Sequence, residues 1–130
     1  MMESRIPASP QPWPETERFW EAANQGRFML QRCCDTGKAF FYPRAHSPFT
    51  GRNHCEWFEA SGRGTLYSFS VLPKARPPYC IAYVELEEGP IILTNIVGAD
   101  FDRLEIGQPV KVTFVDSENG QKVPMFSPAG

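Results

Sequence analysis

The chain has 130 residues, of which 42% are hydrophobic and 22% are charged. This composition is enough for the core of one domain and excludes a charge-dominated disordered chain. The 13 prolines and 10 glycines argue against a helical bundle, because proline interrupts the interior of helices. The net charge of -2 and the isoelectric point near 5.7 argue against general nucleic-acid binding.

The charges are unevenly distributed along the sequence. Residues 27–76 carry eight lysines or arginines against three acidic residues, whereas residues 77–130 carry three against eight. The middle third is therefore a candidate surface for an anion or an acidic partner. The alternative is a fold that interleaves these segments, in which case the opposite charges largely offset each other.

Residues 1–13 contain three prolines, which predicts an extended, weakly ordered arm. A short helix is expected next, because Pro14 suits a first helical turn and Gly26 is a typical stop. Phe19 and Trp20 give this helix an aromatic face, and an isolated helix of this length is only marginally stable. We expect the two side chains to lie in an interface with a partner or a second copy, because a small domain cannot easily bury both.

After the helix the pattern changes to short strands. Residues 28–32 alternate, and a turn at residues 35–37 leads into a second short strand that stops at Pro43, which predicts a hairpin. Residues 44–54 have almost no aliphatic side chains and are expected to form a loop. The sequence becomes extended again at residues 55–60.

The rest of the chain is a series of segments rich in β-branched and aromatic residues. Strands and helices do not alternate in it, which excludes a parallel sheet. A small closed or half-closed antiparallel barrel of five strands fits this pattern, and Met125 and Phe126 in the tail are expected to pack back onto it. The expected strands include residues 64–72, 79–87, 90–98 and 109–115.

Several short motifs occur in an order that is typical of one known family. They include a Leu-x-x-Cys step at residues 30–33, an aromatic-Pro-Arg step at 42–44 and a Ser-Gly-Arg-Gly-Thr turn at 61–65. Over residues 15–128 the chain resembles the zinc-ribbon plus OB-fold proteins encoded beside thiolases and acyl-CoA hydratases. The resemblance implies a mainly β protein, with a five-stranded antiparallel OB-fold barrel preceded by an N-terminal helix and a rubredoxin-like zinc-ribbon hairpin. The arm and helix correspond to residues 1–26, the ribbon to residues 27–60 and the barrel to residues 61–130.

The ribbon of this family places four cysteines in two tight turns that hold zinc. At the corresponding positions this sequence retains a single thiol, because the residues are Cys33, Thr36, Ser47 and Thr50. Neutral hydroxyl groups are poor zinc ligands, so we expect a ribbon that has lost its zinc, in a protein without another cofactor. The alternative is a residual metal site assembled from nearby ligands, namely Cys34, His46, His54 and Cys55.

A catalytic site is hard to assemble from this sequence. A cysteine with His46 or His54 as its base would be a nucleophilic pair, but we favour buried, structural cysteines. No glycine-rich phosphate loop precedes a helix. The opening residues lack the apolar stretch of a signal peptide, and no segment reaches the roughly 18 apolar residues of a membrane helix. We therefore expect a cytoplasmic, non-catalytic protein that does not associate with membranes.

The resemblance implies a role beside the enzymes of acyl-CoA metabolism. We expect an accessory or acyl-CoA-binding protein, with the capacity to self-associate, that docks on a thiolase-like or acyl-CoA hydratase partner in lipid, steroid or polyketide metabolism. The phosphates of coenzyme A would contact four basic residues, Lys38, Arg44, Arg52 and Arg63. The alternative is an OB-fold protein that binds nucleic acid by stacking bases on aromatic side chains. The candidates for stacking are Phe40, Phe41, Tyr42, Trp57, Tyr67 and Phe69.

Overall fold

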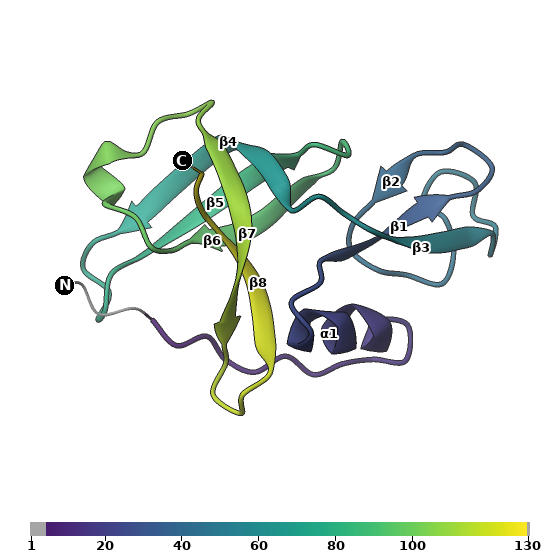
Figure 1. Ribbon diagram of the computed structural model, residues 1–130, viewed down its shortest axis with the longest axis horizontal. Coiled ribbons are helices and arrows are strands. Elements are labelled where there is room, and N and C mark those ends of the chain that lie inside the picture. The colour runs from purple at the N-terminus through teal and green to yellow at the C-terminus, as the bar shows by residue number, and fades with distance from the viewer. Residues whose placement is uncertain (1–4, 130) are drawn as a thin grey trace.

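The computed structural model describes residues 5–129, which form one α-helix and two β-sheets (Figure 1). The first sheet is a three-stranded ribbon, the second is a closed five-stranded barrel, and the helix packs against a strand of each. No helix among the described residues is long and apolar enough to cross a membrane. In chain order the elements are α1 (Glu17–Asn24), β1 (Met29–Cys33), β2 (Ala39–Phe40), β3 (Cys55–Glu59), β4 (Arg63–Leu72), β5 (Tyr79–Leu86), β6 (Ile91–Ile96), the 3-10 helix η1 (Phe101–Arg103), β7 (Pro109–Asp116) and β8 (Lys122–Pro128).

The barrel confirms the expected five-stranded OB-type architecture, with one difference in strand direction. Its strands follow the order β4-β5-β6-β8-β7, and β7 pairs with β4 to close the barrel. All neighbours are antiparallel except β6 and β8, which are parallel, so the expectation of a purely antiparallel barrel is wrong at this seam. The reason is geometric. β6 has the same direction as β4, because both run opposite to β5, and β8 also has the direction of β4, because both run opposite to β7.

The C-terminal strand β8 completes the barrel. The sequence predicts only that Met125 and Phe126 pack back onto the barrel, which is confirmed because both side chains are buried. The segment is in fact a full strand, paired with β7 from Lys122 to Pro128. Its prolines explain why composition alone does not indicate a strand, since proline is rare inside sheets.

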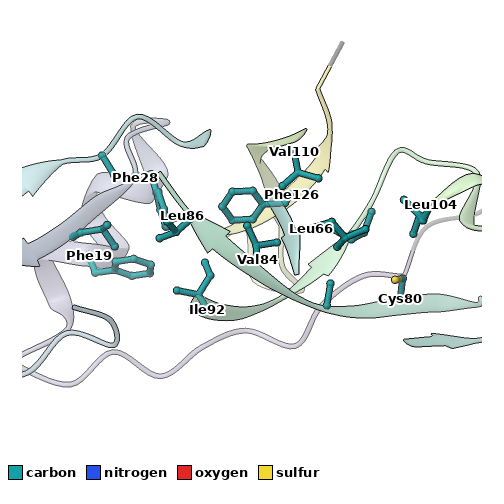
Figure 2. Close-up of a cluster of buried hydrophobic side chains, with 14 of the residues drawn as sticks. Phe19, Phe28, Leu66, Cys80, Val84, Leu86, Ile92, Leu104, Val110 and Phe126 are labelled. Carbon is teal, nitrogen blue, oxygen red and sulfur yellow. The ribbon is translucent and has the colours of Figure 1, made fainter. Parts of the chain in front are cut away.

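Inward-facing side chains of the barrel strands form one continuous core (Figure 2). On β5, Val84 and Leu86 are buried whereas Tyr83 and Glu85 are exposed, which is the alternation expected of a strand with one solvated face. This alternation fixes the register, because a shift by one residue would expose the whole core face. The largest fully buried side chains of the barrel are Leu66, Val84, Ile96, Val110 and Phe126.

The ribbon has β1 at its centre, flanked by β2 and β3. The antiparallel pairing of β1 with β2 confirms the predicted hairpin. The extended segment expected at residues 55–60 becomes β3 and pairs with β1 from Met29 opposite Glu59 to Cys33 opposite Cys55. The ribbon is therefore a three-stranded sheet rather than a simple hairpin.

Helix α1 is shorter than expected, because residues 14–16 form a turn instead of helix. Phe19 and Trp20 are buried, with 3% and 9% of their surfaces exposed. The ring of Phe19 lies edge-on to that of Trp20 at 5.0 Å between centroids, and it contacts Phe28 at 6.1 Å and Phe41 at 5.5 Å. The premise that the domain cannot bury this pair is therefore wrong, and a role of the two residues in a partner interface stays a prediction.

The arm that precedes the helix is extended, as expected, and runs along the barrel (Figure 1). The Glu118 N–H donates to Pro7 O at 3.2 Å, and the Asn119 N–H donates to Ser9 Oγ at 2.9 Å. These bonds attach the described part of the arm to the turn between β7 and β8. Residues 1–4 of the arm lie outside the described residues.

Replacing Phe19 with alanine should destabilise the fold strongly. The change removes a buried ring where the helix, ribbon and barrel meet, and Phe→Ala substitutions in cores cost about 3–5 kcal/mol. Trp13→Ala is the matched control, because the Trp13 side chain is 67% exposed. Urea unfolding followed by circular dichroism should show a much lower free energy of unfolding for Phe19→Ala than for Trp13→Ala. Equal losses in the two variants would contradict this role of Phe19.

Candidate functional site

The end of the ribbon carries a tight turn at residues 33–38, which we call the first knuckle. The Gly37 N–H donates to Cys33 O at 2.7 Å, and the Cys33 N–H donates to Lys38 O at 2.9 Å. Gly37 has a φ of 74°, a left-handed conformation that glycine adopts without steric cost. The turn brings the side chains of Cys33 and Thr36 within hydrogen-bonding reach of each other.

A second knuckle at residues 47–52 repeats this pattern. The Gly51 N–H donates to Ser47 O at 2.9 Å, and the Ser47 N–H donates to Arg52 O at 2.9 Å. Gly51 has a φ of 75°, almost the same as that of the glycine in the first knuckle. The backbone frame of a two-knuckle ribbon is therefore kept, although Ser47 stands where the resemblance implies a cysteine.

The Cys33 thiol is buried between the two knuckles. Hydrogen bonds from Ser47 and Thr36 lower the pKa of this thiol to about 7, because they stabilise the thiolate more than burial disfavours it. Ser47 Oγ also accepts the N–H of Phe49 at 3.1 Å. The structure thus brings Cys33, Ser47 and Thr36 together as the family frame implies, but hydrogen bonds join them.

This set of donors does not fit a zinc ion. A tetrahedral structural site needs four thiolate, imidazole or carboxylate ligands, whereas positions 33, 36, 47 and 50 offer one thiol and three hydroxyls. All three hydroxyls already accept backbone N–H groups. Besides Ser47 Oγ, Thr36 Oγ1 accepts that of Lys38 at 3.3 Å, and Thr50 Oγ1 accepts that of Arg52 at 3.2 Å. The absence of zinc from the protein stays a prediction, and the chemistry of these side chains favours it.

The alternative ligands do not gather around a common point. His54 Nδ1 lies 3.0 Å from Asp35 Oδ1, and His46 is exposed. Cys34 is exposed and Cys55 is half-buried, and desolvation raises the pKa of both thiols. In the part of the chain that the structure describes, no three His, Cys, Asp or Glu side chains are placed to hold one metal ion.

Restoring the three missing thiols should restore zinc binding. The variant Thr36→Cys, Ser47→Cys, Thr50→Cys carries four thiols on two knuckles whose backbones already have the required turns, so we expect about one zinc per chain. Elemental analysis after gel filtration measures this, and the wild-type protein should hold far less.

The control is the same triple variant with Cys33→Ser in addition, which should bind zinc more weakly. Stoichiometric zinc in the wild-type protein would contradict the expected loss of the metal.

The four basic residues expected to contact phosphates are all exposed, but they do not lie on one element. Lys38 and Arg52 end the two knuckles. Arg44 is fixed by its main chain, because its N–H donates to Gln31 Oε1 at 2.7 Å and its carbonyl accepts from Gln31 Nε2 at 3.0 Å. Arg63 begins strand β4 of the barrel. The structure therefore places three of the four on the ribbon segment and one on the barrel.

A groove that is not evident from the sequence opens between β6 and β8. It has a volume of about 290 Å³, and its walls come from α1, the ribbon segment and the two barrel strands. We call it the seam groove. A hydrogen bond of 3.0 Å from Trp20 Nε1 to Tyr42 Oη connects two of its lining side chains. The lining also includes Ile92, Leu93, Pro124 and Met125.

The groove lies where the pairing of β6 with β8 is short. Among the described residues, a single residue pair joins these two strands. Ile96 pairs with Phe126, and the Val97 N–H donates to Phe126 O at 2.9 Å. The neighbouring rungs of a parallel ladder would use the N–H groups two residues away on β8. Those residues are Pro124 and Pro128, and proline has no N–H. The two strands therefore separate on the side of Pro124.

The wall of the seam groove is largely apolar but, besides Asn95 and the bonded pair Trp20 and Tyr42, includes two further polar groups. Thr94 Oγ1 is buried and has no hydrogen-bond partner among the described residues. The carbonyl of Leu93 stands at the rung that Pro124 cannot complete. An apolar hollow with a few polar groups is the usual form of a small-molecule site. In the sequence, the signal for this groove is the spacing of Pro124 and Pro128 on either side of Phe126.

Helix, two-knuckle ribbon and barrel together define a class of protein in which a rubredoxin-like ribbon precedes an OB fold. Two family models match the chain accordingly. The model described as "ChsH2, rubredoxin-like zinc ribbon domain" matches residues 20–47. The model described as "ChsH2, C-terminal OB-fold domain" matches residues 57–115.

Known relatives have related names. A "DUF35 domain-containing scaffold protein" of Methanothermobacter thermautotrophicus is 37% identical over 109 residues, which are 77% of this chain and 81% of the relative. A "Probable enoyl-CoA hydratase alpha subunit" of Thermomonospora curvata is 36% identical over 95% of this chain, but the match covers 41% of that relative. The chain therefore spans about two fifths of the length of that hydratase subunit.

A solved structure described as "Ltp2-ChsH2(DUF35) aldolase" has the same fold, with a TM-score of 0.81 and 33% identity over 94% of this chain and 100% of that chain. The protein belongs to the DUF35 family of ChsH2-like zinc-ribbon and OB-fold proteins, which confirms the resemblance seen in the sequence.

Proposed function

We propose that this protein is a non-catalytic accessory subunit that docks on a thiolase-like or acyl-CoA hydratase partner and holds part of an acyl-CoA there. The seam groove is the observation that carries the proposal, because it is a largely apolar slot lined in part by the ribbon segment that also carries Lys38, Arg44 and Arg52. The names of the relatives, a scaffold protein, a hydratase subunit and an aldolase complex, support a partner of this kind.

The residues with nucleophilic or basic side chains support a non-catalytic role. Hydrogen bonds lower the pKa of the Cys33 thiol, but its side chain is fully buried and is not accessible to an acyl group. Desolvation raises the pKa of Cys34 and of Cys55, which lowers the fraction of each thiol that is present as the more reactive thiolate. His54 Nδ1 pairs with Asp35 Oδ1 at 3.0 Å, and among the described residues no hydrogen bond joins the His54 ring to a thiol. Chemistry on the acyl group would therefore come from the partner.

The size of the seam groove suits the extended arm of coenzyme A rather than the whole molecule. Its volume of about 290 Å³ is at the lower end of the range for small-molecule sites, which is about 300–1,000 Å³. The amide groups of a pantetheine arm would find an acceptor in the Leu93 carbonyl. The phosphates would then lie outside the groove, on basic side chains.

Of the four basic residues considered, Arg44 is the one best placed for those phosphates. It follows Tyr42, a lining residue of the seam groove, by two positions, and its main chain is fixed by Gln31. Lys38 and Arg52 lie on the knuckles of the same segment, whereas Arg63 would have to act from the barrel. A partner that closes over this surface would desolvate the charges and strengthen the contacts.

The nucleic-acid alternative receives less support from the arrangement of aromatic rings. Of the six aromatic residues considered for stacking, Tyr42 and Tyr67 are exposed, whereas Phe40 is buried and the other three are partly buried. Stacking of successive bases needs rings that are accessible on one surface.

Blocking the seam groove should weaken acyl-CoA binding. Leu93 is 59% exposed at the groove, and Leu93→Asp would place a carboxylate in an apolar wall. Calorimetry with octanoyl-CoA, on the protein together with the partner that co-purifies from its host, should show at least a tenfold loss of affinity, about 1.4 kcal/mol. Arg44→Ala should cause a smaller loss.

Ile106→Asp is the matched control, because Ile106 is 70% exposed and does not line the groove. Equal affinities of Leu93→Asp and Ile106→Asp would remove the groove from the proposal. Binding of single-stranded oligonucleotides, with no binding of octanoyl-CoA in the presence of the partner, would favour the nucleic-acid alternative.

A further inference from the structure

Two cysteines of the ribbon face each other across a strand pair. Cys33, the last residue of β1, lies directly opposite Cys55, the first residue of β3. Directly opposite residues of an antiparallel pair have their side chains on the same face of the sheet. The two thiols therefore lie side by side. Neither cysteine lines the seam groove, so the pair has no role in the proposed acyl-CoA site.

The hydrogen bonds on either side show which kind of position the pair occupies. The Cys34 N–H donates to His54 O at 2.9 Å, and at the other end of the ladder the Ala60 N–H donates to Phe28 O at 2.8 Å. Hydrogen-bonded and non-hydrogen-bonded pairs alternate along an antiparallel ladder. Counting from either end places the two opposed cysteines at a non-hydrogen-bonded pair.

This position has the geometry that a disulfide needs. At non-hydrogen-bonded pairs the Cα atoms are about 4.5 Å apart, which is the closer of the two spacings. Disulfides bridge Cα atoms about 4.4–6.8 Å apart, so Cys33 and Cys55 can be joined without moving the strands apart or sliding them.

The other two thiols are placed differently. Cys34 follows Cys33 directly, is the first residue of the turn after β1 and is exposed. Cys80 is buried in the core of the barrel, as Figure 2 shows. Among the four free cysteines, Cys33 and Cys55 are the pair that a strand register holds face to face.

We propose that Cys33 and Cys55 form a reversible oxidation site, at which a hydroperoxide converts the two thiols into a disulfide that fastens the first knuckle to β3. Cys55 is the half-buried member of the pair and is the one that a small oxidant reaches, since the Cys33 side chain is fully buried.

The reaction balances in two steps. The sulfur of Cys55 attacks one oxygen of the hydroperoxide, the O–O bond breaks, and water or an alcohol leaves, which gives a sulfenic acid. The sulfur of Cys33 then attacks the sulfur of Cys55, the S–O bond breaks, the S–S bond forms, and the hydroxide leaves as water with the proton of Cys33. The two thiols lose two electrons, which reduce the peroxide, and a dithiol reductant reverses the change.

Peptide mapping of the full, folded chain tests the proposal. The protein is treated with hydrogen peroxide, free thiols are blocked with N-ethylmaleimide, and trypsin then releases residues 33–38 and 53–63 because basic residues precede and end both segments. We expect these two peptides to be linked, two of the four thiols to be lost to alkylation, and dithiothreitol to restore both.

Cys34→Ser is the matched control, because Cys34 is in the same peptide as Cys33. The linked peptide should persist in Cys34→Ser and disappear in Cys55→Ser and in Cys33→Ser. Circular dichroism establishes that the variants are folded, and Cys55→Ser is informative even if the buried Cys33→Ser fails to fold. Oxidation of the folded wild-type chain without this linked peptide, or a linkage that needs Cys34, would overturn the proposal.

Discussion

The structure depends on a chain of aromatic contacts that fixes the ribbon to the barrel. Helix α1 has eight residues and would not be stable alone, so its position is set by packing. Phe28, just before β1, contacts Phe19 of the helix at 6.1 Å and Phe126 of the barrel at 5.9 Å between ring centroids. Edge-on rings of this kind add to the free energy of burial. Both knuckles and the seam groove take their places from this junction.

The seam groove combines that junction with a property of proline. The helix and the ribbon segment supply Trp20 and Tyr42, which are joined by a hydrogen bond, while Pro124 prevents β8 from pairing further with β6. A residue with an N–H group at position 124 would supply the donor that the next rung of the ladder, at the Leu93 carbonyl, lacks. The candidate site is thus a consequence of one missing N–H group and two aromatic side chains from distant segments.

Local signals account for the parts of the fold that could be predicted. The strand expected at residues 79–87 is Tyr79–Leu86, because alternation with a period of two is visible in any single segment. The burial of Phe19 and Trp20 could not be predicted in this way, since it depends on rings brought together only by the tertiary fold. The knuckles are expected only from the resemblance to the family's ribbon, since the residues alone indicate a hairpin and a loop. The groove could not be predicted, because it depends on β6 lying next to the part of β8 that contains Pro124, and only the tertiary fold sets that neighbour.

The single rung between β6 and β8 also determines where the barrel yields. Every other neighbouring pair of barrel strands is joined by at least three residue pairs, whereas this one has Ile96 opposite Phe126. A hydrogen bond contributes only about 0.5–1.5 kcal/mol net, and proteins open first where such bonds are few. The barrel is therefore closed, but its β6–β8 pair is the most easily opened of its strand pairs. The spacing between β6 and β8 can therefore change while the other strand pairs stay intact. The same barrel core is then compatible with grooves of different width between these two strands.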